Sequence, residues 1–332
     1  MKNLRTLAAT VAALTVLAAC SSDASDDSSS GTADANNARA DSSAVPTAGA
    51  PQEIELPGAS VFPEGVAFDA ASGSVFVGST DDGTVFRAGL DDQVAELFLP
   101  PGEDGRSAVT GLAVRDGLLF VAGRDTGRIF AYDAATAALV AVHDAAGGER
   151  SLINDIALSD DFAYVTDSFR PVLYRLAIDG ETVGEPDSWI DLTDTDVPFD
   201  ADGFNLNGIA ITDTGDALYT VHYGTGDLFR IDTGTAAVEL VDLDEEQLTG
   251  GDGLEIEGST ITAIANGDLV TIELDDTGLT ARTSSREPLD GLLFPTTLAL
   301  TDDAYIVVNS QLNMTGSDNQ PVIPFTLSVL ER

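Results

Sequence analysis

Lysine is almost absent from this 332-residue sequence: Lys2 is the only one, and 15 basic residues stand against 56 acidic ones. The formal net charge is −41. With no cationic surface to neutralise phosphates, the chain is not expected to bind nucleic acid. Its negative field attracts cations and repels anionic polymers.

Cysteine is equally scarce, since Cys20 is the only one and no disulfide can form within the chain. It follows a short positive segment and an apolar stretch at 7–17 that is too short to span a bilayer. The residues Leu17-Ala18-Ala19-Cys20 resemble the lipobox of bacterial lipoproteins. We therefore expect a signal peptide over residues 1–19, lipidation of Cys20, and export to the outer face of the bacterial cell membrane.

Large apolar residues are few between Cys20 and residue 52, where Ser, Asp, Ala and Gly dominate. Such a segment cannot bury enough surface to offset its ordering entropy, so a disordered tether is predicted over residues 20–52. Residues 53–332 are long enough for one large domain. We expect a monomer that reaches the membrane only through its lipid anchor.

No long amphipathic helix pattern occurs after residue 53; short β-rich runs alternate with turn residues, which is typical of a sandwich, a barrel or a propeller. Six segments share one pattern, in which a polar residue, usually followed by a small one, precedes an apolar pair or triplet. Their first residues recur every 44 to 53 positions and are Glu64, Thr110, Asn154, Asn207, Asp252 and Thr296. Three or four strands in about 45 residues make one propeller blade. The sequence predicts an all-β, six-bladed β-propeller over residues 53–332.

One further run, Glu53-Ile54-Glu55-Leu56, precedes the first repeat. We expect it to join the last blade and close the ring. Closure removes most of the sheet edges that an open array of blades would expose.

Equivalent positions in the blades of a propeller surround its axis, so the six first residues are expected at one end of the central channel. All six carry oxygen, and none is basic or apolar. Two carboxylates and two carboxamides form the oxygen-rich site that hard cations such as Ca²⁺ prefer. Zinc or copper is less suited, because the ring contains no histidine or cysteine. The alternative is that these residues only form turns at the strand starts.

Four phrases carry a resemblance to a known family: Pro63-Glu64-Gly65, Ile153-Asn154-Asp155-Ile156-Ala157, Asn205-Leu206-Asn207-Gly208 and Gly251-Asp252-Gly253-Leu254. Over roughly residues 53–332 the chain resembles the family of gluconolactonase, senescence marker protein and luciferin-regenerating enzyme. The order Glu, Asn, Asn, Asp is also similar to the calcium sites of diisopropylfluorophosphatase and paraoxonase. The resemblance implies one divalent cation that holds and polarises the substrate's carbonyl or phosphoryl oxygen. Its implied ligands are Glu64, Asn154, Asn207 and Asp252, with Ca²⁺ foremost and Mn²⁺, Mg²⁺ or Zn²⁺ as alternatives.

The second blade departs from this family. Its lactonases often have an Asn-Asp-Gly-like phrase where this chain has Val109-Thr110-Gly111. The catalytic histidine pair of the paraoxonase type also has no clear counterpart. Substrate specificity therefore does not carry over.

Three residues are candidates for catalysis. Asp252 is the family-like candidate for both ligand and general base. The ends of the second strands, at Ser79, Asp167, His222 and Asn309, are expected near the same mouth, and of these His222 and Asp167 are the other two candidates. A strand-end histidine can instead bond a turn, and Asp-Ser begins many turns.

One more histidine, His143, and two arginines near blade two remain to be considered. His143 is expected on an outer strand and receives no role. Arg106 and Arg124 either meet an anionic substrate or lie on the surface.

Two functions follow from these observations. The first is a metal-dependent hydrolase of the lactonase class that opens a small cyclic ester at the cell envelope. The alternative is a non-catalytic propeller whose cation serves to bind a small ligand or a partner protein, or to brace the core. Phosphotriester hydrolysis is a further possibility on this scaffold.

Overall fold

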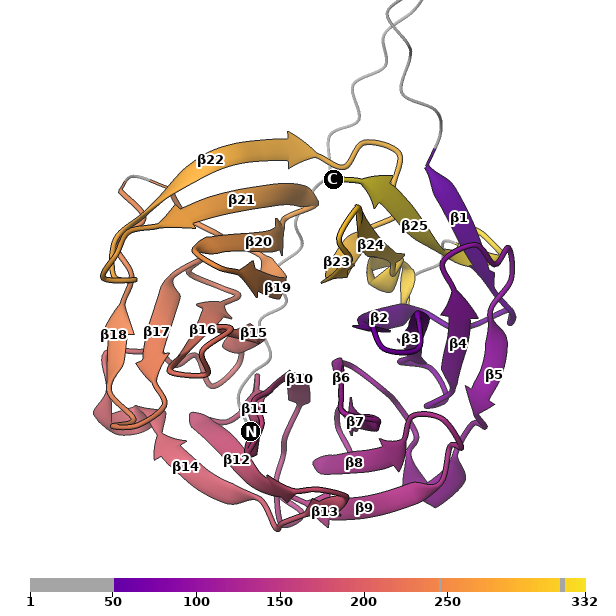
Figure 1. Cartoon of the computed structure of the whole chain (residues 1–332), viewed down its shortest axis with the longest axis horizontal. Coiled ribbons are helices and arrows are strands. Elements are labelled where there is room, and N and C mark those ends of the chain that lie inside the picture. Colours follow the sequence, from indigo (N-terminus) through magenta and orange to yellow (C-terminus); the bar gives the residue numbers. More distant parts are fainter. Residues whose placement is uncertain (1–50, 245, 317–319) are drawn as a thin grey trace, which may run out of the picture. The chain divides into compact units, whose positions relative to one another are not determined.

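The computed structural model describes residues 51–244, 246–316 and 320–332. These residues form six antiparallel sheets around a common axis (Figure 1), which confirms the predicted six-bladed β-propeller. The predicted signal peptide, Cys20 and nearly all of the 20–52 tether lie outside the described residues. In the part of the chain that the structure describes, no helix has the length and apolarity needed to cross a membrane.

Each of the first five blades is a sheet whose strands follow one another outward from the axis. Blade one contains β2 (Pro63–Asp69), β3 (Ser74–Ser79), β4 (Val85–Gly89) and β5 (Glu96–Leu99). Blade two contains β6 (Leu112–Arg115), β7 (Leu118–Ala122), β8 (Arg128–Asp133) and β9 (Leu139–Asp144). Blade three contains β10 (Ile153–Leu158), β11 (Phe162–Asp167), β12 (Val172–Asp179) and β14 (Asp187–Asp191), with the short β13 (Thr182–Val183) also paired to β12.

Blades four and five repeat this arrangement. Blade four contains β15 (Leu206–Ile211), β16 (Ala217–His222), β17 (Leu228–Asp232) and β18 (Val238–Leu240). Blade five contains β19 (Gly251–Glu257), β20 (Thr260–Ala265), β21 (Asp268–Leu274) and β22 (Ala281–Pro288). Among the described residues, three single-turn 3₁₀ helices lie in the connections: η1 (Glu103–Gly105), η2 (Leu192–Asp194) and η3 (Leu312–Met314).

The sixth blade combines both ends of the domain. Its inner strands are β23 (Pro295–Leu300), β24 (Ala304–Asn309) and β25 (Phe325–Glu331). The outermost strand is β1 (Gln52–Leu56), which runs antiparallel to β25 with Ile54 opposite Leu327. Figure 1 shows the two strands side by side. The prediction that the run before the first repeat closes the ring is therefore confirmed.

The hydrophobic core is divided among the interfaces between neighbouring blades. Apolar side chains of blade one, such as Phe76, pack against side chains of blade two, such as Phe130. Because both faces of a blade are covered, the middle strands are rich in apolar residues, and every residue of β7 is buried. The outer strand β9 has no fully buried residue. In blade two the second strand β7 is therefore more buried than either the innermost strand β6 or the outermost strand β9.

Candidate functional site

A cavity of about 290 Å³ lies where the innermost strands begin. Its walls include all six residues at the first position of the repeat: Glu64, Thr110, Asn154, Asn207, Asp252 and Thr296. Five of them are buried, and Asp252 is partly exposed to the cavity. Two of these residues, Glu64 and Thr296, are 232 positions apart in the chain, yet the Thr296 hydroxyl donates to the Glu64 carbonyl oxygen over 3.1 Å.

The ring residues lie at irregularities in the sheets. In five blades the pairing between the first and second strands shifts register across the ring residue; in blade three, for example, the shift falls between Ile153 and Ile156. A β-bulge turns a side chain away from the direction that regular pleating would give it. These shifts re-aim the ring side chains at their strand starts, where the cavity lies.

Glycines allow the inner strands to approach one another at this level. A Cβ on Gly208 would lie 2.0 Å from the carbonyl oxygen of Asp252, and one on Gly65 would lie 2.2 Å from that of Thr110. No larger residue fits at either position without moving backbone. The polar-then-small pattern of the repeat therefore has a physical cause, since the small residue lets its polar neighbour converge with those of the adjacent blades.

Two buried oxygens in the cavity have no hydrogen-bond donor among the described residues, Glu64 Oε2 and Asn154 Oδ1. The Asn154 side chain is oriented by its Nδ2, which donates to Ser168 Oγ over 2.7 Å, while that hydroxyl donates to the Leu206 carbonyl. The amide oxygen is left facing the ring. Buried oxygens without a donor are costly, so such atoms call for a ligand, an ion or water.

The threonines of the ring also present lone pairs. Thr110 Oγ1 donates its proton to the Ile153 carbonyl oxygen over 2.6 Å, and Thr296 Oγ1 donates to the backbone of blade one. With their protons directed to backbone, these hydroxyls can only accept from, or coordinate, a group in the cavity.

Burial makes the two carboxyl groups of the ring hard to ionise. It raises the pKa of Asp252 to about 8, with a further contribution from the negative charge of Asp155 and an opposing one from the Asn207 amide. Burial and the nearby Asp252 and Asp155 charges also raise the pKa of Glu64 well above its usual value, while Arg124 opposes the rise. A cation placed among these oxygens would offset this cost.

The donors present fit a hard cation better than a soft one. Within the described ranges, no group of three or more His, Cys, Asp and Glu side chains is placed to hold a metal ion. The ring offers two carboxylates, two amide oxygens and two hydroxyls instead. Oxygen donors of mixed charge suit Ca²⁺, whereas zinc sites use nitrogen and sulfur.

The other two predicted catalytic residues, Asp167 and His222, do not line this cavity. The Asp167 carboxylate is 1% exposed and accepts hydrogen bonds from Ser151 Oγ, Leu152 N and Phe169 N. The buried His222 accepts a hydrogen bond at Nδ1 from Thr225 N, and burial lowers its pKa. Both side chains bond to loops at the mouth of the channel. Their catalytic role stays a prediction.

The positions equivalent to these two in other blades also bond locally. Ser79 Oγ donates to the Val61 carbonyl, and Asn309 Nδ2 donates to Thr326 and Ser328. In blades one, three, four and six the second strand thus ends in a polar side chain that bonds to a nearby segment: a loop for Ser79, Asp167 and His222, and strand β25 for Asn309.

The two candidate arginines, Arg106 and Arg124, lie in different environments. Arg106 is fully buried and donates to the Gly83 and Pro100 carbonyls and to the Tyr132 hydroxyl, so it joins blades one and two and is neither a surface residue nor a cavity residue. Arg124 lines the cavity, with a left-handed φ of 53°. On the outer strand β9, His143 lies 3.0 Å from the Glu185 carboxylate and outside the cavity.

The remaining walls of the cavity were not anticipated from the repeat. They include three aromatic residues, Phe204, Tyr223 and Phe294. One signal was available: Phe294-Pro295-Thr296 repeats the Phe62-Pro63-Glu64 phrase, which puts a phenylalanine two positions before the ring residue.

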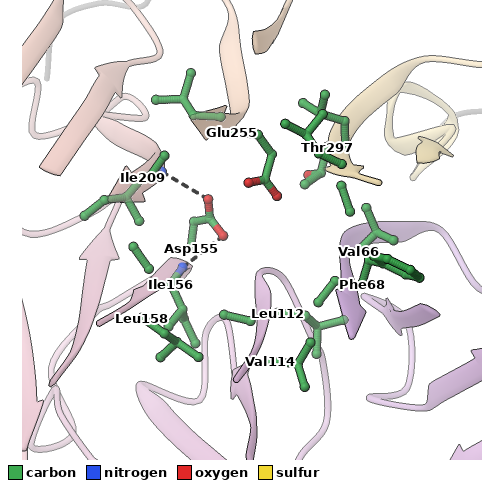
Figure 2. Close-up of a pocket in the computed structure, with 18 of the residues that line it drawn as sticks. Val66, Phe68, Leu112, Val114, Asp155, Ile156, Leu158, Ile209, Glu255 and Thr297 are labelled. Carbon is green, nitrogen blue, oxygen red and sulfur yellow. Dashed lines mark hydrogen bonds between the residues drawn. The ribbon is translucent and has the colours of Figure 1, made fainter. Parts of the chain in front are cut away.

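A second cavity, of about 250 Å³, lies further along the same inner strands. Its walls are largely apolar, but Figure 2 shows the carboxylates of Asp155 and Glu255 pointing into it. Asp155 accepts hydrogen bonds from Ile156 N and Ile209 N, which ties β10 to β15. Burial raises the pKa of Asp155 to about 7, and burial together with the Asp155 charge raises that of Glu255 to about 8.

Comparison with known proteins supports the fold alone. No protein-family model and no curated protein matches the chain. The major allergen Mala s 1 of Malassezia sympodialis is similar in structure, with a TM-score of 0.64 and 12% identity over 84% of this chain and 96% of the allergen. A protein from Lactobacillus plantarum has a TM-score of 0.54 and 15% identity over 81% of this chain and 88% of its own. The RRP9 WD40 repeats have a TM-score of 0.58 and 10% identity over 85% of this chain and 99% of theirs. At these identities the likeness extends to the propeller and not to a function.

Proposed function

We propose that this protein is a cation-dependent hydrolase of small cyclic esters, with Ca²⁺ as the cation. The observation that carries the proposal is the convergence of Glu64 Oε2 and Asn154 Oδ1, both buried and without a donor in the described chain, with Asp252 in one cavity. A ring of oxygens with two carboxyl groups is the kind of site that hard cations occupy.

Four side chains would hold the ion through oxygen: Glu64, Asn154, Asn207 and Asp252. When bound, the ion would polarise the ester carbonyl and stabilise negative charge on its oxygen. The cavity, at about 290 Å³, has room for a small ligand above this ring.

Opening the ring adds water across the ester. The bond between the carbonyl carbon and the ring oxygen breaks, and a proton from water passes to that oxygen, which gives a hydroxy acid. Asp252 is our candidate to relay the proton, because it is the ring carboxyl that is partly exposed to the cavity. Without an ion its pKa is about 8, and a neighbouring positive charge would lower that value and keep Asp252 ionised.

One observation favours the second candidate, a propeller that binds a small ligand without turnover. Neither His222 nor Asp167 lines the cavity, so Glu64 and Asp252 are the acids or bases of neutral-pH chemistry among its described walls. If Asp252 serves only as an ion ligand and takes no proton from water, the site would bind a carbonyl ligand and release it unchanged.

We further propose that the domain is anchored to the outer face of the bacterial cell membrane through a lipid on Cys20. The lone cysteine directly after a short apolar run supports this. Metabolic labelling with a radioactive fatty acid tests it: label on the wild-type protein and none on Cys20→Ser supports the anchor, and label on neither contradicts it.

The hydrolase is tested by turnover of δ-valerolactone, an unsubstituted cyclic ester, with added Ca²⁺ and after chelation. The matched variants are Asp252→Asn and Asp275→Asn, the latter at a surface turn where Asp275 bonds Thr277. Turnover that needs the ion, is lost in Asp252→Asn and persists in Asp275→Asn supports the hydrolase. Ion binding without turnover of any lactone favours the binding propeller.

A further inference from the structure

Part of the cavity wall beyond the ring is apolar. Blades three, four and six contribute its apolar side chains, which are Leu152, Phe204, Tyr223, Phe294 and Leu312. The polar side chains beyond the ring are Thr80 and Arg124 from blades one and two, and Asn313 and Thr315 from blade six. We call the five apolar residues the apolar wall. It lies beside the ring of oxygens, so a ligand whose carbonyl reaches the ring contacts the wall with the rest of its structure.

Two rings of the apolar wall are unusually exposed for phenylalanine. Phe204 is 45% exposed and Phe294 is 43% exposed. Phe204 is held in place by Phe169 and Tyr223, whose ring centroids lie 5.3 and 5.7 Å from its own. Large apolar groups that converge on a cavity mark a ligand site, because a ligand removes their surface from water.

Phe294 occupies a backbone conformation that bulky residues seldom adopt, with φ at 56°. Phe62, at the same position in blade one, has a φ of 44°, but its ring is 9% exposed and packs 5.0 Å from that of Phe325. The same strained phrase therefore buries one phenylalanine in the core and places the other at the cavity. Because the strained backbone at Phe294 does not place its ring in the core, we infer that the strain serves to place the ring at the cavity.

We propose that the apolar wall binds an alkyl or aryl substituent of the lactone, so that the substrate is an apolar lactone and not a polyhydroxylated one. This inference rests on the proposed hydrolase function. Hydroxyl groups placed against Leu152, Phe204 and Phe294 would lose water without gaining hydrogen bonds, which disfavours a sugar lactone. An alkyl chain placed there loses only unfavourable contact with water.

Three lactones with the same six-membered ring separate these classes: δ-valerolactone has no substituent, δ-decalactone has a pentyl chain, and D-glucono-δ-lactone has hydroxyl groups. Burial of about three methylene groups corresponds to roughly a 50-fold gain in kcat/KM for δ-decalactone over δ-valerolactone. D-glucono-δ-lactone should be hydrolysed less efficiently than δ-valerolactone.

The variants Phe294→Ala and Phe204→Ala should each lower the ratio of kcat/KM for δ-decalactone to that for δ-valerolactone by roughly tenfold. Phe199→Ala is the matched control, since Phe199 is 42% exposed but is not part of the cavity wall. It should leave the preference unchanged.

The outcomes for the wall and for the hydrolase are distinct. Turnover of δ-valerolactone with no preference for δ-decalactone, or with a preference for D-glucono-δ-lactone, overturns the apolar substrate and leaves the hydrolase standing. If no lactone is hydrolysed, the hydrolase fails and calorimetry with δ-decalactone tests the wall. Binding that Phe294→Ala weakens and Phe199→Ala does not supports the wall, whereas no binding, or equal binding by both variants, refutes it.

Discussion

Glu255 provides a test of the electrostatics inside the channel. Its carboxyl faces the second cavity together with Asp155 (Figure 2), and burial raises its pKa from a usual 4.5 to about 8. The unfolded chain therefore loses this proton above pH 4.5, whereas the folded protein retains it to about pH 8. Because the folded state binds more protons in this range, Glu255 lowers the free energy of unfolding progressively as pH rises from 4.5 to 8.

The magnitude follows from the two pKa values. At pH 7 the raised pKa lowers the free energy of unfolding by about 3 kcal/mol, since pH 7 lies roughly 2.5 units above the pKa in the unfolded chain and one unit corresponds to about 1.4 kcal/mol. The carboxyl is partly exposed to a cavity that has room for water, and this hydration reduces the effect, so we expect about 2 kcal/mol. Glu255→Gln removes the titratable carboxyl. The free energy of unfolding of the variant should therefore exceed that of the wild type by about 2 kcal/mol at pH 7 and by less than about 1 kcal/mol at pH 5.

The assay is urea unfolding of wild type and Glu255→Gln at pH 5, 6, 7 and 8, with a chelator present so that bound cations do not contribute. Glu287→Gln, at an exposed position on β22, is the control, and its free energy of unfolding should change with pH as that of the wild type does. Stability curves for Glu255→Gln and wild type that stay parallel from pH 5 to pH 8 would refute the reasoning.

Two further predictions concern the ring. Gly208→Ala should lower the free energy of unfolding by about 3 kcal/mol, since its Cβ would meet the Asp252 carbonyl. Thermal unfolding measures this effect, with Gly184→Ala as the control because its Cβ would have no neighbour within 3.4 Å. Equal melting temperatures for the two variants would contradict the prediction. The affinity for Ca²⁺ should fall as pH drops below about 8, by up to about tenfold per pH unit for each carboxyl that must lose a proton, because burial raises the pKa values of Asp252 and Glu64. Titrations at pH 6, 7 and 8 check this, and an affinity independent of pH contradicts it.

The propeller and the ring of oxygens could be predicted because both follow from a repeat. A spacing of about 45 residues determines blade number, and equivalent residues of a closed ring must converge, so Glu64 and Asp252 could be placed together without any structure. The glycine that follows four of the six ring positions, such as Gly208, also marks the repeat, and its cause is the close approach of the neighbouring blade.

The rest of the site depends on loops, whose paths the repeat does not specify. Phe204 and Tyr223 belong to connections of different lengths, and only the folded chain brings their rings together. Asp167 lies at the mouth, as its strand position indicates, but its carboxylate is turned toward the Ser151 loop. Arg106 was expected on the surface or at a ligand, whereas it is buried between blades, a role that its position in a loop did not reveal.

Direct measurement of Ca²⁺ binding by calorimetry tests the central claim, that the ring forms a cation site. We predict one site in the wild type and a loss of affinity of more than about 100-fold in Asp252→Asn, because a direct ligand should contribute more than outer partners, whose loss costs about 10- to 100-fold. Asp275→Asn removes the same charge at the surface and should bind as the wild type does. No saturable binding in the wild type, or equal affinities for Asp252→Asn and Asp275→Asn, would contradict the cation site.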